Sequence, residues 1–336
     1  MTDLGNGGHD MEKACRKTVA ETGRILLEKG LVARTWGNIS ARVDANRFAI
    51  SPSGLGYEHM QEADVPVYDM ATDTYEGSRK PSSEKKIHAA SYRLYPDVLF
   101  VIHTHQDYAT AISLTDTKDL EMTEEEKAVL GKIAIADYGL PGTKKLSANV
   151  ELALKDARIV LMKHHGALIL GTDREDAINK AELLEAVCKR AVVKRIGEIA
   201  ENRQTEQVDE KLLASSENML FTSTPEILKM ADKGGFVAQI DDMAQMLGRK
   251  IRSVPNDNAA ILHALNKQDA VLVKNAGLVI MTEQKDDAEA LKLLIEKAAM
   301  AKVYTLSRGI QADLSLFDCM LMRCVYKMKY SKKKEG

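Results

Sequence analysis

The sequence predicts a fold in which helices alternate with the strands of a buried sheet, in the α/β or α+β class. Three short apolar runs, at 98–102, 159–162 and 167–170, have the length of buried strands. Long segments with helical spacing of apolar residues occupy 11–30 and 173–200. Because strands and helices are interleaved along the chain, we expect the helices to pack against the sheet.

The other predicted elements rest on local signals. Gly30 is placed to end the first helix, and Asp173 to cap the start of the long one. Pro66 weakens its strand or puts it at a sheet edge, because proline donates no ladder hydrogen bond. In chain order, the remaining segments are a short strand that runs into a turn at 47–54, a strand at 65–68 and helices at 84–94 and 149–155.

Composition excludes several classes of function. Lys plus Arg (47) nearly balance Asp plus Glu (49), leaving a formal charge of −2, so nothing recruits nucleic acid or an anionic membrane. The four cysteines are scattered, without a metal-ligand or redox spacing. The polar N-terminus lacks the apolar core of a signal peptide, and no run of about 18 apolar residues could span a bilayer. We therefore expect a soluble, cytoplasmic protein.

An internal repeat links two parts of the chain. When Gly166 is set on Gly277, the segments 147–169 and 258–280 align without a gap, and several packing positions agree. The pair His164-His165 then falls on Asn275-Ala276. We interpret this as a duplicated helix–strand–turn–strand–helix unit that kept its packing residues and lost its ligands, rather than two similar units that arose by chance.

Histidines and one glutamate form a candidate metal site. His103 and His105 follow an apolar strand, and residues two apart in an extended chain point to the same face. One histidine of the 164–165 pair, at a turn between two strands, would give the third ligand of a catalytic site. Glu84 adds a carboxylate that can bind the ion or act as a base. Nitrogen and carboxylate ligands suit zinc, manganese, cobalt and iron alike, so the ion stays open.

Three short clusters have the character of an oxyanion cradle. Glycine lets a backbone approach a ligand closely, while exposed N–H groups, hydroxyls and a helix N-terminus favour phosphate oxygens. Taken singly, each cluster is more typical of a turn or a helix cap than of a phosphate site. The candidate residues are Gly37, Asn38, Ser53, Gly54, Ser82 and Ser83.

Five linked motifs occur in order along residues 11–200. They are Thr35-Trp-Gly-Asn-Ile-Ser40, Ser51-Pro-Ser-Gly54, Pro81-Ser-Ser-Glu84, His103-Thr-His105 and His164-His-Gly166. Their sequence and spacing resemble the class II aldolase and adducin family. The resemblance implies a three-layer α/β/α domain with a central mixed, largely antiparallel sheet. It also implies a sugar-phosphate substrate and subunits that assemble as a homo-oligomer, a tetramer in the family.

The resemblance assigns roles to these residues. It implies one divalent ion per chain, zinc before manganese, cobalt or iron, held by His103, His105 and His165, with Glu84 at the ion until substrate arrives. The six cradle residues named above match the positions that bind the substrate phosphate. Tyr138 matches a tyrosine that protonates the aldehyde oxygen from a neighbouring subunit, although an ordinary interface or core aromatic explains it equally well.

The implied reaction is cleavage of a ketose 1-phosphate to dihydroxyacetone phosphate and an aldehyde through a metal-stabilised enediolate, with Glu84 moving the proton. Related epimerases usually carry Asp where Glu84 stands, so the longer side chain favours an aldolase. A 4-epimerase, a dehydratase, a decarboxylase and a non-catalytic adducin-like scaffold remain alternatives. No motif in the sequence identifies the aldehyde half of the substrate.

The chain is longer than simple members of that family. We therefore predict a catalytic domain at 1–212, a degenerate, non-catalytic repeat at 213–310 and a C-terminal tail at 311–336. The repeat lacks the segments that would correspond to Pro81–Glu84 and His103–His105, so we expect it to be structural.

Overall fold

The computed structural model describes residues 6–32, 34–197 and 205–334. The first five residues of the polar N-terminus, part of the polar stretch after Glu201 and the last two residues of the predicted tail lie outside this part. The chain forms two compact units, Met1–Ala191 and Val192–Gly336. No helix in the described ranges combines the length and apolar character that a membrane span requires.

An eight-stranded sheet forms the centre of the first unit, in the order β4-β3-β2-β1-β5-β8-β7-β6. All neighbouring strands pair antiparallel except β6 and β7, which are parallel. The predicted mixed, largely antiparallel sheet is therefore confirmed. Its strands are β1 (Asn38–Arg42), β2 (Arg47–Ile50), β3 (Val67–Asp69), β4 (Thr74–Glu76), β5 (Phe100–Thr104), β6 (Ile133–Ala136), β7 (Ile159–Met162) and β8 (Gly166–Gly171).

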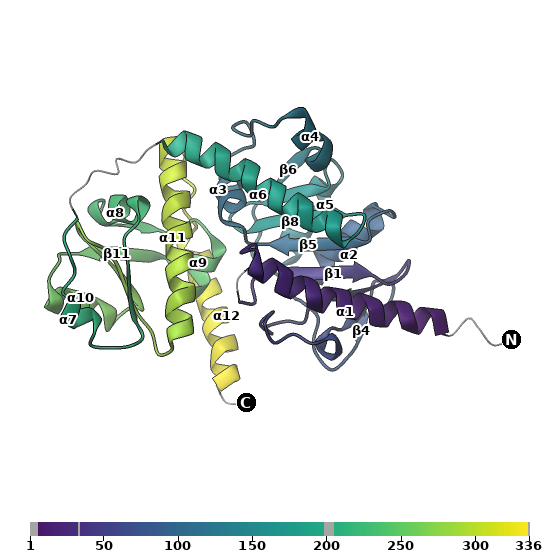
Figure 1. The fold of residues 1–336 in the computed structure, drawn as a ribbon, viewed down its shortest axis with the longest axis horizontal. Coiled ribbons are helices and arrows are strands. Elements are labelled where there is room, and N and C mark those ends of the chain that lie inside the picture. Colours follow the sequence, from purple (N-terminus) through teal and green to yellow (C-terminus); the bar gives the residue numbers. More distant parts are fainter. Residues whose placement is uncertain (1–5, 33, 198–204, 335–336) are drawn as a thin grey trace. The chain divides into compact units, whose positions relative to one another are not determined.

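Helices cover both faces of this sheet and complete the three layers. Figure 1 shows α1 and α6 running across one face, while α2 and α5 contact each other over the opposite face. The apolar side chains between α2, α5 and the sheet form one buried cluster. The helices are α1 (Asn6–Glu28), α2 (Lys85–Leu94), α3 (Asp107–Ser113), α4 (Glu124–Leu130), α5 (Lys144–Leu154) and α6 (Arg174–Ile196), with a 3₁₀ turn, η1, at Glu62–Asp64.

Two predicted boundaries shift for local reasons. Helix α5 begins at Lys144, not at 149, because the Thr143 hydroxyl accepts a hydrogen bond from the Leu146 amide at 3.3 Å and caps the helix. Strand β5 starts and ends two residues later than its apolar run and includes His103 and Thr104. The buried sheet therefore carries polar side chains at the end of β5, which apolar periodicity alone does not show.

The second unit contains a five-stranded sheet in the order β10-β11-β12-β13-β9. Only β11 and β12 are parallel. A helix that the sequence does not predict, α12, occupies part of the tail and packs against α9. The strands are β9 (Met219–Thr222), β10 (Gly235–Val237), β11 (Lys250–Val254), β12 (Ala270–Val273) and β13 (Gly277–Met281), and the helices are α7 (Glu210–Leu213), α8 (Pro225–Asp232), α9 (Asp241–Met246), α10 (Asn258–Leu265), α11 (Lys285–Ser307) and α12 (Leu316–Lys334).

The two sheets share a series of pairings. The order β11-β12-β13-β9 has the same parallel and antiparallel neighbours as β6-β7-β8-β5. The hairpin turns agree as well, because His164 (φ 69°) and Asn275 (φ 59°) both adopt the left-handed conformation that few non-glycine residues tolerate. The first sheet continues beyond β5 with β1, whereas the second ends at β9.

A glycine follows each of these turns at a point of close approach between strands. A Cβ on Gly166 would collide with the carbonyl oxygen of Thr104 and lie 3.2 Å from Cε1 of His103. A Cβ on Gly277 would collide with the carbonyl oxygen of Thr222 and lie 2.9 Å from the Phe221 ring. In both units the strand pairing leaves no room for a side chain.

We predict that Gly166→Ala lowers the free energy of unfolding by about 1–3 kcal/mol, because the backbone of β5 must move to admit the methyl group. Gly8→Ala is the matched control, since nothing lies within 4 Å of that position on α1 and alanine favours a helix. Urea denaturation followed by circular dichroism measures both. A Gly166→Ala protein as stable as wild type would contradict the close approach.

Candidate metal centre

The three predicted histidine ligands meet where β5 ends and β8 begins. His103 lies on β5, opposite Asn38 of β1 on one side and Leu168 of β8 on the other. His105 follows the strand directly, and His165 stands in the turn that leads into β8. The left-handed conformation of His164 shapes this turn, so the sharp reversal of the chain brings His165 over β5.

The imidazole nitrogens converge within the distances of a single ion site. One nitrogen from each of His103, His105 and His165 lies within 4.8 Å of the other two. The Nε2 atoms of His103 and His105 are 3.0 Å apart, and the rings of His103 and His165 stack at 5.0 Å between centroids. Both His103 and His165 are buried, while His105 is partly exposed.

The donor set fits a divalent cation. Nδ1 of His103 donates to the carbonyl oxygen of Ala167 at 2.9 Å, which places the proton of the neutral ring there and leaves the Nε2 lone pair directed into the cluster. Three imidazoles with one adjacent carboxylate are a usual set for zinc and other late divalent ions. The residues present could therefore hold such an ion.

Glu84 lies against two of these histidines. Its Oε1 is 3.0 Å from Nε2 of His165, and its Oε2 is 3.3 Å from Nε2 of His103. Burial of Glu84 favours the neutral carboxyl, but His165 and His103, when they are protonated, supply charges and hydrogen bonds that outweigh it and hold the pKa of Glu84 well below its ordinary value. Glu84 is also the residue directly before α2, where the helix N-terminus favours a negative charge.

The predicted cradle segments come from separate parts of the first unit. The loop that holds Ser53 and the loop that holds Ser82 are joined by an antiparallel bridge between Pro52 and Pro81. Ser82 is buried, and its hydroxyl accepts a hydrogen bond from the Glu84 amide at 3.2 Å. Ser82 thus stabilises the turn that leads into α2, and its phosphate role stays a prediction.

The other cradle candidates differ in accessibility. Ser53, Gly54 and Ser83 are exposed, as binding groups must be. Gly37 has φ 81°, and a Cβ there would collide with the carbonyl oxygen of His103, so glycine is required for β1 to approach β5. The Asn38 side chain is buried and donates to Oε2 of Glu84 at 2.9 Å. Its amide is therefore engaged with Glu84.

Tyr138 lies at the outer side of the histidine turn. Its ring meets the ring of His164 edge-on, with 4.9 Å between centroids. His164 precedes a predicted ligand but points its ring towards Tyr138, so the structure separates the two histidines of the pair. A role for Tyr138 in a neighbouring subunit's reaction stays a prediction.

Sequence reasoning missed three buried residues behind Glu84. These are Ser40, His88 and Tyr92, which connect to Asn38 through side-chain hydrogen bonds. A signal was available, because His88 and Tyr92 follow Glu84 at helical spacing of four and eight residues, so that all three share one face of α2.

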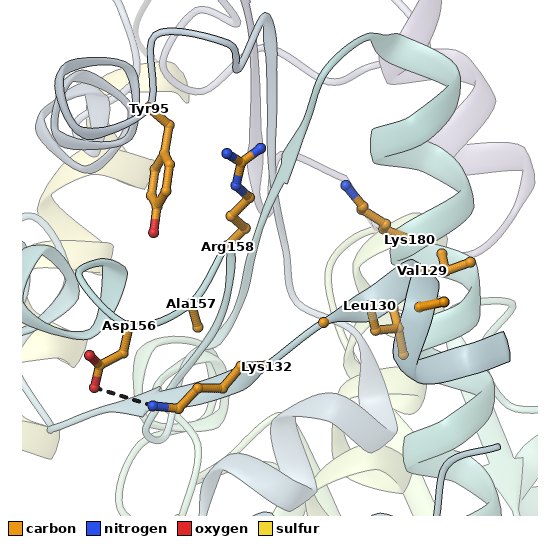
Figure 2. Close-up of a pocket in the computed structure, with 10 residues that line it drawn as sticks. Tyr95, Val129, Leu130, Lys132, Asp156, Ala157, Arg158 and Lys180 are labelled. Atoms are coloured by element: carbon orange, nitrogen blue, oxygen red, sulfur yellow. Dashed lines mark ion pairs between the residues drawn. The ribbon is translucent and has the colours of Figure 1, made fainter. Parts of the chain in front are cut away.

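A pocket of about 390 Å³ lies apart from the histidines and is shown in Figure 2. Its cations already have partners, since Lys132 is 3.4 Å from Asp156 and Lys180 is 2.7 Å from Asp176. Arg158 likewise pairs with an aspartate, at 2.6 Å. These neutralised cations do not make the pocket a second anion site, and the candidate chemistry stays with the histidine cluster.

Two relatives are similar in sequence to about half of this chain. The L-fuculose phosphate aldolase of Methanococcus maripaludis is 34% identical over 166 residues, which cover 49% of this chain and 89% of that protein. The 3-oxo-tetronate 4-phosphate decarboxylase of Haemophilus influenzae is 29% identical over 194 residues, covering 56% of this chain and 88% of that protein. One relative is therefore an aldolase and the other a decarboxylase.

A solved structure and a family model also match this chain. The solved structure of YgbL from Klebsiella pneumoniae matches 58% of this chain and 95% of its own, with a TM-score of 0.51 and 21% identity, which shows a common fold. Residues 17–192, the segment that contains all three clustered histidines and Glu84, match the family model for the class II aldolase and adducin N-terminal domain. The chain therefore belongs to the class II aldolase and adducin family.

Proposed function

We propose that the first unit is a metal-dependent aldolase that cleaves a ketose 1-phosphate into dihydroxyacetone phosphate and an aldehyde. The observation that carries this proposal is the buried carboxylate of Glu84 beside the cluster of His103, His105 and His165. A divalent ion, zinc before other metals, would be held by the three histidines and would supply Lewis-acid stabilisation of negative charge on the substrate oxygens. The similarity to an L-fuculose phosphate aldolase supports the reaction type.

The other steps of the reaction are assigned to side chains of the first unit. Bond cleavage leaves an electron pair on the carbon next to the carbonyl group, and Glu84 delivers the proton that this carbon takes up. Ser53, Ser82 and Ser83, with the backbone of the neighbouring loops, would orient the phosphate. The hydroxyl proton of the aldehyde half would pass through Tyr138 of a neighbouring subunit. This role requires a homo-oligomer, and the family suggests a tetramer. We expect the protein to act in the cytoplasm.

A decarboxylase is the second candidate, because one relative acts on a 3-oxo-tetronate 4-phosphate. Loss of carbon dioxide from a 3-oxo acid also leaves an electron pair beside a carbonyl group, so the same ion and the same proton carrier would serve. A panel of ketose 1-phosphates and 3-oxo acid phosphates separates the two reactions. Release of dihydroxyacetone phosphate identifies the aldolase, and release of carbon dioxide identifies the decarboxylase.

We predict that the purified full chain carries about one divalent ion and that His103→Ala removes it, because a catalytic site needs all three protein ligands. Elemental analysis by mass spectrometry measures the content and identifies the metal. His59→Ala is the matched control, since this side chain is 77% exposed. Equal metal content in wild type and His103→Ala would refute the site.

Glu84→Gln keeps the size of the side chain and removes its basicity, so we expect the metal to remain and the turnover number to fall by roughly 10²–10⁴-fold. Initial rates of dihydroxyacetone phosphate release, with metal content measured on the same samples, test this. Glu58→Gln, on an exposed loop, serves as the control. Wild-type turnover in Glu84→Gln would exclude Glu84 as the proton carrier.

The second unit is proposed to be a duplicated copy of the later part of the catalytic domain. In support, Phe221 pairs with Val279 as His103 pairs with Leu168, so Phe221 takes the place of a ligand on β9. By the same register, Ser223 and Ala276 stand where the other two clustered histidines do. The described part of this unit has no counterpart of β1 or α2 and thus none of Glu84.

The apolar side chains on one face of this sheet support a structural role for the second unit. Val208 and Leu212, from the segment before β9, pack with Ala276 and Val279 in one apolar cluster on the face where Phe221 lies. This side of the sheet is thus filled by apolar side chains. Because α6 runs across the division between the units, the catalytic domain proposed for 1–212 includes the whole helix.

Truncation after Gly197 tests that role. We expect the shortened chain to keep its metal and to lose solubility or its oligomeric state, because all proposed ligands lie in the part that remains. Size-exclusion chromatography with light scattering and elemental analysis measure the two properties together. A soluble truncation with unchanged assembly but no metal would show instead that the second unit supports the site.

A further inference from the structure

A chain of buried polar side chains leads away from Oε2 of Glu84 through Asn38. Asn38 donates from Nδ2 to Oε2 of Glu84 at 2.9 Å, and its Oδ1 is hydrogen-bonded to Nε2 of His88. Nδ1 of His88 is 2.7 Å from the hydroxyl of Ser40, which in turn is 2.7 Å from the hydroxyl of Tyr92. The chain therefore ends four side chains away from the carboxylate.

The carboxylate fixes the direction of every hydrogen bond in this chain. An ionised Glu84 only accepts, so Asn38 must present its N–H group to it and its carbonyl oxygen to His88. His88 must then carry its proton on Nε2, which leaves Nδ1 to accept from Ser40. The hydroxyl of Ser40 is thereby used as a donor and accepts from Tyr92. The opposite tautomer of His88 would turn the carbonyl oxygen of Asn38 towards the carboxylate.

Burial makes these assignments mutually dependent. All of the linked side chains are at most 8% exposed, and Ser40 and His88 are fully buried. The ring of His88 stacks on Phe48, with 6.4 Å between centroids. Burial, with a further contribution from the charge of His103, lowers the pKa of His88 to about 3, against the opposing effect of Glu84. The ring thus stays neutral and keeps one N–H group.

We propose that His88 is a positioning residue for the proton transfer by Glu84. It locks the Asn38 carboxamide in the one orientation that anchors Oε2 of Glu84, so that Oε1 carries the proton. The inference rests on the proposed function of Glu84. In this arrangement the Asn38 side chain holds the carboxylate, and its contact with a substrate phosphate stays a prediction.

The first test reads the tautomer directly in the full, metal-loaded chain. With ¹⁵N-labelled histidine, and with His88→Gln used to assign the signal, NMR is expected to show His88 as the Nε2–H tautomer. The signal should not titrate between about pH 5 and pH 9, a range in which an exposed histidine changes charge. An Nδ1–H tautomer would overturn the proposal, because Asn38 could not then donate to Glu84.

The second test separates positioning from packing. His88→Leu keeps an apolar body but loses the donor, whereas His88→Gln places an amide N–H near the position of Nε2. We expect His88→Leu to lower kcat by roughly 10- to 100-fold, as loss of a supporting hydrogen bond at a metal site does, with KM and metal content near wild type. His88→Gln should recover most of the turnover.

Two results would refute the positioning role. One is wild-type kcat in His88→Leu. The other is an equal loss of kcat in both variants that follows their loss of thermal stability. If His88→Leu does not fold, Tyr92→Phe removes only the terminal hydroxyl and should lower kcat in the same direction by a smaller factor, and an unchanged kcat there would count against the chain.

The two tests also separate this inference from the proposed function. A wild-type chain that cleaves no sugar phosphate would refute the aldolase, while the NMR experiment would still decide the hydrogen-bond assignment. An active aldolase with His88 in the Nδ1–H form would refute the positioning role alone.

Discussion

The site depends on one constraint, the pairing of β5 with β1 on one edge and β8 on the other. This register sets His103, a predicted ligand, opposite Asn38 and opposite Leu168. Asn38 holds Glu84, and Leu168 belongs to the hairpin that brings in His165, so all three lie on one line across the sheet. Two glycines make the close approach possible. Gly37 faces the carbonyl oxygen of His103 and Gly166 that of Thr104, where any Cβ would force the strands apart.

Glu84 joins two environments of different chemistry. The imidazoles of His103 and His165 face its oxygens and favour the charged carboxylate. A neutral chain that starts at Asn38 and His88 supplies a single, directed donor to Oε2. A carboxylate that is buried and ionised requires partners on every side. The same partners fix its orientation, which a proton carrier needs.

The second unit has a similar backbone arrangement and none of the proposed chemistry. Its hairpin also has a left-handed residue, at Asn275, and a crowded glycine, at Gly277, and Phe221 meets that glycine as His103 meets Gly166. Backbone crowding and strand register depend on few side chains, so two sheets can share them while their other side chains differ. In the described part of the second unit, no strand carries a counterpart of Asn38 and no helix carries a counterpart of Glu84.

The sequence by itself determined the mixed sheet with helices on both faces and the residues of the metal cluster. Apolar periodicity is local, and the histidines His103 and His105 lie two apart on one strand, so these inferences needed no long-range information. The tertiary structure shows His165 at the cluster, as the resemblance implied, whereas the residues by themselves left His164 and His165 open. It alone decided that the Asn38 side chain is hydrogen-bonded to Glu84 and that His88 is hydrogen-bonded to Asn38. These assignments depend on contacts between β1, α2 and β5, segments separated by tens of residues, whose register no local pattern specifies.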